Sequence, residues 1–237
     1  ELFQGRNLRN TLVGVSLASI GLVTFWGGHI YGKNALLREA QKEALVAESV
    51  APAAAKDASD AEKVAYKASR QAALKKHEEK IKRAEMLSMV LNTIGGGLGL
   101  VLFGWISTRL GRKGAFILYH AVAFVMMLLL FEVLIANDVG TMWLAITLPV
   151  FGFFTLGMHA GYAVYFPELY PTRLRGTGAG FCFNMGRLAT AAAFFGFGAL
   201  QAPPTPEDKA VLLAPLYLVG VVIVLFARET RDEELPE

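Results

Sequence analysis

Residues 165–187 of this chain read YFPELYPTRLRGTGAGFCFNMGR, a short charged turn with two prolines between two long apolar runs. The run from Val139 to Phe166 contains no Asp, Glu, Lys or Arg, and the run from Thr177 to Ala202 contains only Arg187. A helix needs about 20 mainly apolar residues to cross a bilayer core of about 30 Å. Both runs therefore predict membrane-spanning helices, and the turn predicts a loop at one membrane face.

The composition of the whole chain also indicates a membrane protein. Of the 237 residues, 54% are hydrophobic and 18% are charged, whereas soluble domains are about a quarter charged. The net charge of +3 is spread among interleaved acids and bases, so nucleic acid is not expected as a partner. The single cysteine, Cys182, excludes an intrachain disulfide and is expected to be a packing residue.

No motif for catalysis or cofactor binding stands out. The sequence has no phosphate-binding loop of the GxxxxGK[ST] type, no cluster of metal ligands and no nucleophile–base spacing. We therefore expect neither an enzyme nor an ATP-driven pump, and no metal or cofactor.

Working outward from residues 165–187, the apolar runs predict an all-α, polytopic membrane protein with six transmembrane helices. The predicted spans are 11–32, 86–108, 115–136, 139–164, 177–200 and 210–227. The predicted connections on one side are a connector at 1–10, a basic turn at 109–114, the turn at 165–176 and a tail at 228–237. The chain begins with Glu1 and shows no leader, so we expect a fragment of a longer protein.

Residues 33–85 predict a soluble helical hairpin inserted between the first two spans. They are rich in Ala, Lys and Glu, which are strong helix formers. We expect helices at about 35–50 and from about residue 58, the second continuing without a break into the next span. Asp57, Ser59 or Asp60 is the expected cap. Such charge runs usually form a solvated face, and a docking surface for a partner is the alternative.

Basic residues predict the orientation. The side with the short turns carries nine Lys and Arg, and the other side carries thirteen, of which all but Lys209 lie in the insertion. The positive-inside rule is strongest for short loops, and an insertion of this length is near its limit. We therefore expect the short basic turns in the cytoplasm, and the plasma (inner) membrane as the location.

Three turns resemble signatures of the major facilitator superfamily. Residues 104–113 (GWISTRLGRK) resemble its G-x-x-x-D-R-x-G-R-R/K turn, and residues 167–178 (PELYPTRLRGTG) resemble a turn of its sugar-porter and aromatic-acid branches. Residues 229–236 are similar to the tail signature after the last span. Thr108 stands where the family has Asp, and Arg228 replaces its Pro.

The resemblance implies the carboxy-terminal six-helix half of a twelve-helix transporter. The implied partners are a small-molecule substrate, a proton, the lipid bilayer and a missing amino-terminal six-helix half. The insertion at 33–85 has no counterpart in the resemblance.

Charged residues at the span ends are candidates for a conformational latch. An acid–base cluster there can hold helices in one state and release them in another, as alternating access requires. The alternative is that these residues only anchor loops and set topology. The candidates are Arg109, Gly111, Arg112, Lys113, Glu168, Arg173 and Arg175.

Arg187 is the leading candidate for the substrate or proton pathway. It lies ten residues into its span, roughly 15 Å deep, so it is expected to face the bundle interior with a partner. That partner is an anionic substrate or a coupling carboxylate, or else helix carbonyls or a carboxylate of the missing half. The other pathway candidates are Asn184, His159, Glu132 and Asn92.

Two of these candidates have plainer alternatives. Glu132 lies near a membrane boundary and is expected to reach water, with a buried role in proton coupling as the alternative. His29, near the end of the first span, is expected to be interfacial, with a water-filled path as its alternative.

The sequence thus predicts a secondary active transporter of a small polar metabolite, a sugar or an organic or aromatic acid, with proton coupling. The alternative is a non-transporting membrane receptor or scaffold that uses residues 33–85 as a docking surface.

Overall fold

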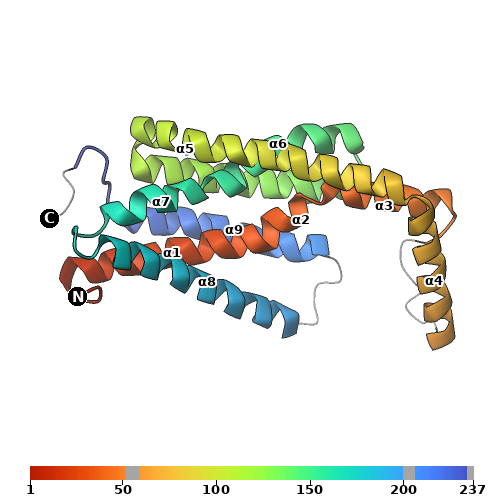
Figure 1. The fold of residues 1–237 in the computed structure, drawn as a ribbon, viewed down its shortest axis with the longest axis horizontal. Helices are drawn as coiled ribbons and strands as arrows, with labels where there is room; N and C mark the ends of the chain where they lie inside the picture. Colours follow the sequence, from red (N-terminus) through yellow and green to blue (C-terminus); the bar gives the residue numbers. More distant parts are fainter. Residues whose placement is uncertain (52–58, 200–205, 234–237) are drawn as a thin grey trace.

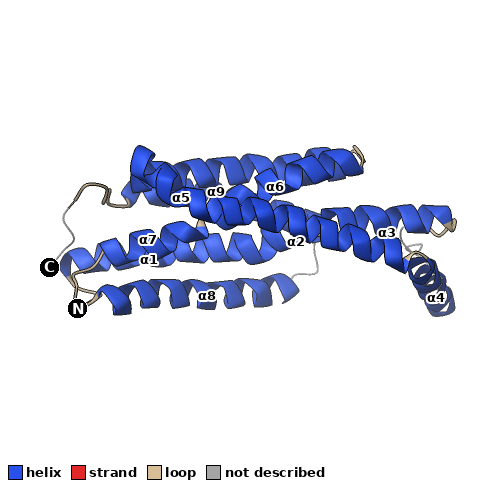
Figure 2. Cartoon of the chain, turned by 45° about the horizontal axis from the view of Figure 1, so that its top comes forward, coloured by secondary structure: helices blue, strands red, loops and turns tan. Residues whose placement is uncertain are grey.

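The computed structural model describes residues 1–51, 59–199 and 206–233, and within these ranges every regular element is a helix. The all-α prediction is confirmed, as Figure 2 shows. The elements are α1 (Gly5–Thr24), the π-helix η1 (Phe25–His29), α2 (Ile30–Gly32), α3 (Ala35–Ala47), α4 (Asp60–Lys76), α5 (Glu78–Leu128), the π-helix η2 (Leu129–Ile135), α6 (Thr141–Gly157), α7 (His159–Glu168), α8 (Arg175–Ala199) and α9 (Pro206–Phe226).

Except for α4, which lies across it, the helices run back and forth along one long axis (Figure 1). Gly111 has a left-handed backbone (φ 80°, ψ 166°) that folds α5 into two antiparallel arms. The arms pack against each other: the ring centroids of Phe103 and Phe116 lie 5.4 Å apart, and the Tyr119 hydroxyl donates to the Gly99 carbonyl at 2.9 Å. We call the end with Gly111 the turn end.

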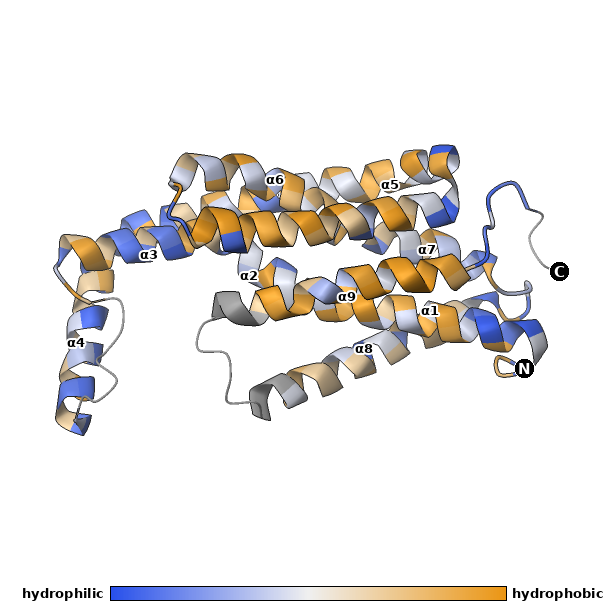
Figure 3. Cartoon of the chain, turned by 180° about the vertical axis from the view of Figure 1, so that it is seen from behind, coloured by the Kyte–Doolittle hydropathy of each residue, from blue (hydrophilic) through white to orange (hydrophobic). Residues whose placement is uncertain are grey.

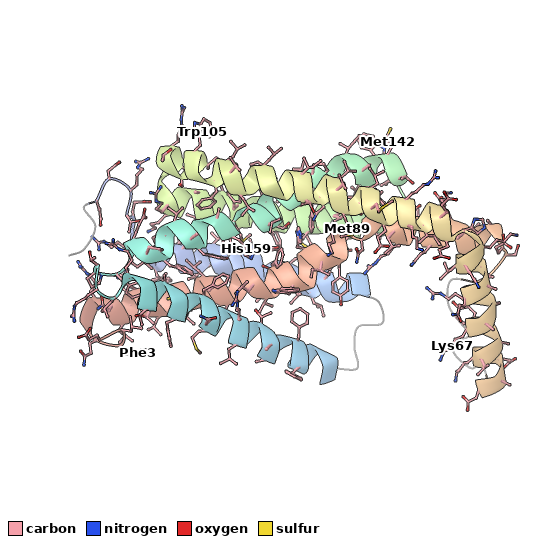
Figure 4. The ribbon with its side chains drawn as sticks, viewed as in Figure 1. Phe3, Lys67, Met89, Trp105, Met142 and His159 are labelled. Carbon is pink, nitrogen blue, oxygen red and sulfur yellow. The ribbon has the colours of Figure 1, made fainter. Side chains whose placement is uncertain are left out.

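Three helical stretches are long and apolar enough to cross a membrane: Gly5–Ala47, Glu78–Ile135 and Thr141–Glu168. Ala210–Phe226 is a shorter apolar helix. Figure 3 shows hydrophobic residues along the bundle and hydrophilic ones on α3, α4 and the turn end. Large apolar side chains point outward, including Trp105 at 57% and Met142 at 65% exposure (Figure 4). Such an apolar exterior fits contact with lipid.

The first arm of α5 lies very close to α6 because glycines face it. A Cβ on Gly95 would collide with the Pro149 carbonyl, and one on Gly99 would collide with the Phe153 carbonyl. Small residues at four-residue spacing permit this approach of helix backbones in lipid. Gly97 lies between them in the sequence but faces open space.

This geometry predicts opposite effects for two neighbouring glycines. Gly99→Ala is expected to destabilise the protein by about 1–3 kcal/mol, because the added methyl group forces α5 and α6 apart. Gly97→Ala has room and should be neutral or stabilising by up to about 1 kcal/mol, since alanine favours the helix. Thermal unfolding of the purified variants measures both. Equal stability of the two variants would contradict the close α5–α6 contact.

The insertion differs in one respect from the prediction. Helix α4 ends at Lys76, and His77 has a non-helical backbone (φ −107°, ψ 17°) before α5 begins. The prediction of an unbroken helix is therefore wrong. The bend coincides with a contact from Glu48, which follows α3: its carboxylate pairs with Lys76 at 2.8 Å and His77 at 3.1 Å.

The outer part of the insertion is solvated. Ser59 caps α4 through a reciprocal pairing with Glu62, as one of the predicted caps. Only Ala73 of α4 is buried, and the helix turns away from the bundle axis (Figure 1). Residues 52–58, which include the start of the second helix predicted in the insertion, and residues 200–205 lie outside the described residues. Helix α9 begins at Pro206, four residues before the predicted span at 210–227.

The first predicted connector is also partly helical. Helix α1 begins at Gly5, within residues 1–10. Its Arg9 side chain donates to the Phe226 carbonyl at 3.0 Å, which joins the start of α1 to the end of α9 at the turn end.

Candidate functional site

An aromatic pocket of about 280 Å³ lies between α7 and α8. Its walls stack against one another: the Tyr162 ring lies 5.2 Å from Phe166, at an angle of 16°. His159, a predicted pathway residue, lines this pocket in the middle of the bundle (Figure 4). The lining residues are His159, Tyr162, Ala163, Phe166, Pro167, Ala179 and Phe183.

Arg187 lies one helical turn beyond Phe183 of that pocket. Its guanidinium carbon lies 4.8 Å from the centre of the Phe183 ring. Its Nη1 donates to Asn184 Oδ1 at 3.4 Å, so two predicted pathway residues lie together on α8. The arrangement places a cation and an amide at the edge of an aromatic surface.

Arg187 is exposed in the described part of the chain, where it contacts Asn184 and Phe183, so these residues do not supply the interior partner that was predicted for it. Helix α8 packs on α1 through a different face. A Cβ on Gly186 would lie within 3.0 Å of the Ala18 backbone, and Cys182 lies against Gly14. The small residues on this face allow the contact with α1 and direct Asn184 and Arg187 away from it.

The remaining pathway candidates lie elsewhere. Asn92 is 1% exposed and contacts His29, which is 4% exposed because side chains of other helices cover it; the interfacial position of His29 stays a prediction. Glu132 lies exposed on η2, and its contact with water stays a prediction. The structure therefore brings Arg187 and Asn184 together near His159, and it separates Asn92 and Glu132 from them into other elements.

Two predicted latch residues form a half-buried ion pair at the turn end. Arg112 donates from Nε and Nη2 to the two carboxylate oxygens of Glu168, at 3.0 and 2.9 Å. The two side chains are 15% and 16% exposed. Arg112 also donates to Ser107 Oγ at 2.9 Å, and Glu168 accepts from Thr230 Oγ1 at 2.6 Å. This bidentate pair is the strong kind of charge-assisted hydrogen bond, and it raises the pKa of Arg112.

Glu229 joins the same group and was missed by the sequence prediction. Its carboxylate accepts backbone N–H groups of Arg112 at 2.8 Å and Lys113 at 3.1 Å. It also accepts those of Thr230 and Arg231. Gly111 makes this possible, since a Cβ there would lie 2.5 Å from the Glu229 carboxylate. The only sequence signal was the tail resemblance that contains Glu229. We call Arg112, Glu168 and Glu229 the turn-end cluster.

The other latch candidates divide into two groups. Arg109 stacks on Trp105 at 4.7 Å, and its carbonyl accepts from Arg231, so it lies beside the turn-end cluster. Arg173 pairs instead with Glu1 at 2.8 Å on the surface, and Arg175 donates weakly to Thr172 at 3.4 Å.

The turn-end cluster predicts a pH effect. Burial raises the pKa of Glu229, but its four backbone donors outweigh burial and hold the pKa below its ordinary value of 4.5. A lowered folded-state pKa contributes stability above the unfolded pKa that is lost as the pH falls through the folded pKa.

We expect wild type to unfold at a higher temperature than Glu229→Gln near neutral pH, with the gap narrowing below about pH 4.5. Thermal unfolding across the pH range measures this gap. If the difference in unfolding temperature stays constant down to about pH 3, the negative charge of Glu229 does not stabilise the turn.

Comparison with known proteins decides the family. The profile of the family described as "Sugar (and other) transporter" matches residues 84–237, more than half of the chain. This chain belongs to the sugar (and other) transporter family. The resemblance to the major facilitator superfamily is thereby confirmed, and the family and the apolar helices together identify an integral membrane protein.

Curated relatives match this family member over about half of the 237 residues of this chain. A putative metabolite transport protein of Haemophilus influenzae is 28% identical over 128 residues, which are 54% of this chain and 30% of that protein. The cis,cis-muconate transport protein of Acinetobacter baylyi is 29% identical over 135 residues, 56% of this chain and 32% of that protein. The synaptic vesicle 2-related protein of Rattus norvegicus is 33% identical over 110 residues, 46% of this chain and 19% of that protein.

The matched part of this sugar (and other) transporter family member spans less than a third of the length of these relatives. No solved structure matches the chain.

Proposed function

We propose that this chain is the carboxy-terminal, six-helix half of a twelve-helix secondary transporter. The protein moves a small polar metabolite, a sugar or an organic acid, by alternating access with proton coupling. The spans are α1 with η1 and α2, the two arms of α5, α6 with α7, α8, and α9.

The exposure of Arg187 carries this proposal. A charged side chain in the middle of a transmembrane helix is costly against lipid, so it faces protein or a water-filled path. The same face of α8 carries Asn184, and Gly176 and Gly180 there have open space where a Cβ would be. We infer that this face borders the amino-terminal half across a polar pathway and does not face acyl chains.

The chemistry of the site favours an anion over a neutral sugar. The pocket supplies aromatic faces, and Arg187 supplies a cation at its edge. Guanidinium groups bind carboxylates through two parallel hydrogen bonds. The Acinetobacter baylyi relative is named for cis,cis-muconate, a dicarboxylate, which is in keeping with this choice.

The turn-end cluster supports alternating access. It ties the α5 turn to the end of α7 through Glu168 and to the segment after α9 through Glu229. Breaking this ion-paired cluster would free these helix ends to separate. We propose that it closes the cytoplasmic side in one state and opens in the other, with the basic turns in the cytoplasm and the plasma (inner) membrane as the location.

A scaffold function remains the second candidate. The solvated helix α4 extends away from the bundle and offers an exposed surface for a partner (Figure 1). A scaffold requires no substrate pathway, so transport assays separate the two candidates.

The test of transport uses the full-length protein reconstituted in vesicles. Labelled cis,cis-muconate, benzoate and glucose are offered with and without a pH gradient across the membrane. We expect uptake of a carboxylate, stimulated by an inward proton gradient. A thermal unfolding transition shows that the protein in the vesicles is folded. If such vesicles take up none of the three compounds, the scaffold function is favoured.

A further inference from the structure

His29 occupies a buried polar site that joins three transmembrane passes. Its ring lies on η1 and is 4% exposed. Nδ1 lies 2.8 Å from Thr155 Oγ1 on α6, and Nε2 lies 3.0 Å from Asn92 Nδ2 on α5. Thr155 and Asn92 are each 1% exposed, so the three groups depend on one another for hydrogen bonds.

The partners define the protonation of the ring in this conformation. The Thr155 hydroxyl donates to the Phe151 carbonyl at 2.6 Å, so its oxygen accepts from His29. His29 Nδ1 therefore carries the hydrogen, and Nε2 accepts from the Asn92 amide. The ring is neutral, with one hydrogen on Nδ1 and a lone pair on Nε2.

Asn92 has an unused acceptor at this site. Its Oδ1 is buried and has no hydrogen-bond partner among the described residues. A buried, unpaired polar atom is unfavourable and calls for an explanation, of which a change of partner during function is one. Rotation of the amide by a half-turn exchanges Nδ2 and Oδ1. Oδ1 then accepts from a protonated Nε2, so Asn92 serves both charge states of His29.

Two aromatic rings flank His29 on its faces. Phe25 lies 4.8 Å away at 20°, and Phe151 lies 5.9 Å away at 10°. The faces of aromatic rings attract a cation within about 6 Å, so this stack offsets part of the cost of burying an imidazolium. His29 also ends a π-helical turn, a rare element that is frequent at functional sites.

Phe25 connects this site to the α7–α8 pocket. Its ring lies 4.8 Å from the ring of His159, which lines the pocket. The titratable groups that act on His29 are His159 on α7 and Lys33 after α2. The other packed elements present uncharged groups: α6 presents Thr155 and Phe151, α5 presents Asn92, and α9 presents Leu213 next to the neighbouring Gly27.

We propose that His29 is the residue that binds the coupled proton, with Asn92 as its switching hydrogen-bond partner. This inference rests on the proposed function of the chain as half of a proton-coupled transporter. A proton from one aqueous side adds to Nε2 of His29. The Asn92 amide then turns so that its Oδ1 accepts a hydrogen bond from the new N–H. The proton leaves Nε2 to the other side when the helices rearrange. Because the site ties η1, α5 and α6 together, gain or loss of the charge changes the contacts among these passes.

Replacement of His29 tests the proposal in vesicles that contain the full-length protein, with labelled cis,cis-muconate and benzoate as the probes. His29→Gln keeps hydrogen-bonding groups but binds no proton. With equal pH on both sides, we expect this variant to exchange the probe at a rate within about twofold of the wild-type rate. With a pH gradient, we expect it to accumulate about tenfold less probe than wild type, or less still. The matched control is His120→Gln, since His120 is also fully buried but bonds only the Phe116 carbonyl of its own helix. The control should accumulate the probe as wild type does.

Accumulation by His29→Gln equal to that of wild type would overturn the proposal. If this variant also loses exchange, the ring nitrogen NMR signals of a His77→Gln/His120→Gln/His159→Gln protein decide, because His29 is then the sole histidine among residues 1–237. We expect the His29 ring to gain a second N–H as the pH falls from about 8 to about 3, and Asn92→Leu to weaken proton binding about tenfold. A ring that stays neutral throughout would overturn the proposal.

These signals need no substrate. If wild type transports neither probe, the proposed function fails, and the His29 titration is still measured independently.

Discussion

Replacing Arg187 with alanine is expected to reduce uptake of a carboxylate probe by about 100-fold. Loss of one partner from a desolvated, hydrogen-bonded charge pair costs about 2–5 kcal/mol, and each 1.4 kcal/mol is about a factor of ten. Arg187 has no ion-pair partner among the described residues and contacts only Asn184 and Phe183 there, so its charge is available to an anion. Initial uptake rates of labelled cis,cis-muconate in vesicles measure the effect.

The control for this prediction is Arg173→Ala. Arg173 is 69% exposed and pairs with Glu1 on the surface, so its loss should change uptake by no more than about threefold. Arg187→Lys is expected to recover part of the activity, since it restores the charge without the planar fork. Normal carboxylate uptake by Arg187→Ala would remove this residue from the substrate pathway.

Breaking the ion pair of the turn-end cluster is expected to have the largest effect on stability. Glu168→Ala leaves the half-buried Arg112 guanidinium without its bidentate partner, and its cost is expected to approach but not reach the about 3–5 kcal/mol of a fully buried pair. The same change should slow uptake, because the helix ends lose the contact that holds them together in one state. Thermal unfolding in detergent and uptake in vesicles measure the two effects.

A double-mutant cycle separates the pair from its surroundings. Glu168→Ala and Arg112→Met, alone and together, should show a coupling energy above about 1 kcal/mol. The matched surface pair, Glu1→Ala with Arg173→Ala, should show about 0–1 kcal/mol. Equal coupling in both pairs would mean that the turn-end cluster contributes no more than a surface ion pair.

Much of the turn end was predictable from sequence. Arg112 and Glu168 follow apolar runs of spanning length, and the alternation of spans places both ends on one side. Their pairing therefore follows from topology. The role of Glu229 does not, because it depends on the left-handed backbone at Gly111 and on where the chain after α9 returns.

The orientation of side chains around the helices could not be predicted. The sequence placed Arg187 at mid-membrane, but its direction depends on which face of α8 meets α1, and that is decided by small residues such as Gly186. His29 appeared interfacial by its position along the first span, whereas the approach of Asn92 and Thr155 from other helices buries it. Both outcomes depend on contacts between residues far apart in the chain.

The break in the insertion has a similar cause. The Lys- and Glu-rich residues around His77 are good helix formers, and no local signal marks a stop. The bend coincides with the pairing of Glu48 with Lys76 and His77, a contact across 28 residues of chain in the case of Lys76.

The most direct test of the account is the ratio of labelled cis,cis-muconate inside and outside vesicles that contain the full-length wild-type protein. Under an inward proton gradient, we expect this ratio to rise well above one and to return to one when a protonophore collapses the gradient. A ratio that stays at one with the gradient in place, for muconate, benzoate and glucose alike, would contradict proton-coupled transport through this chain.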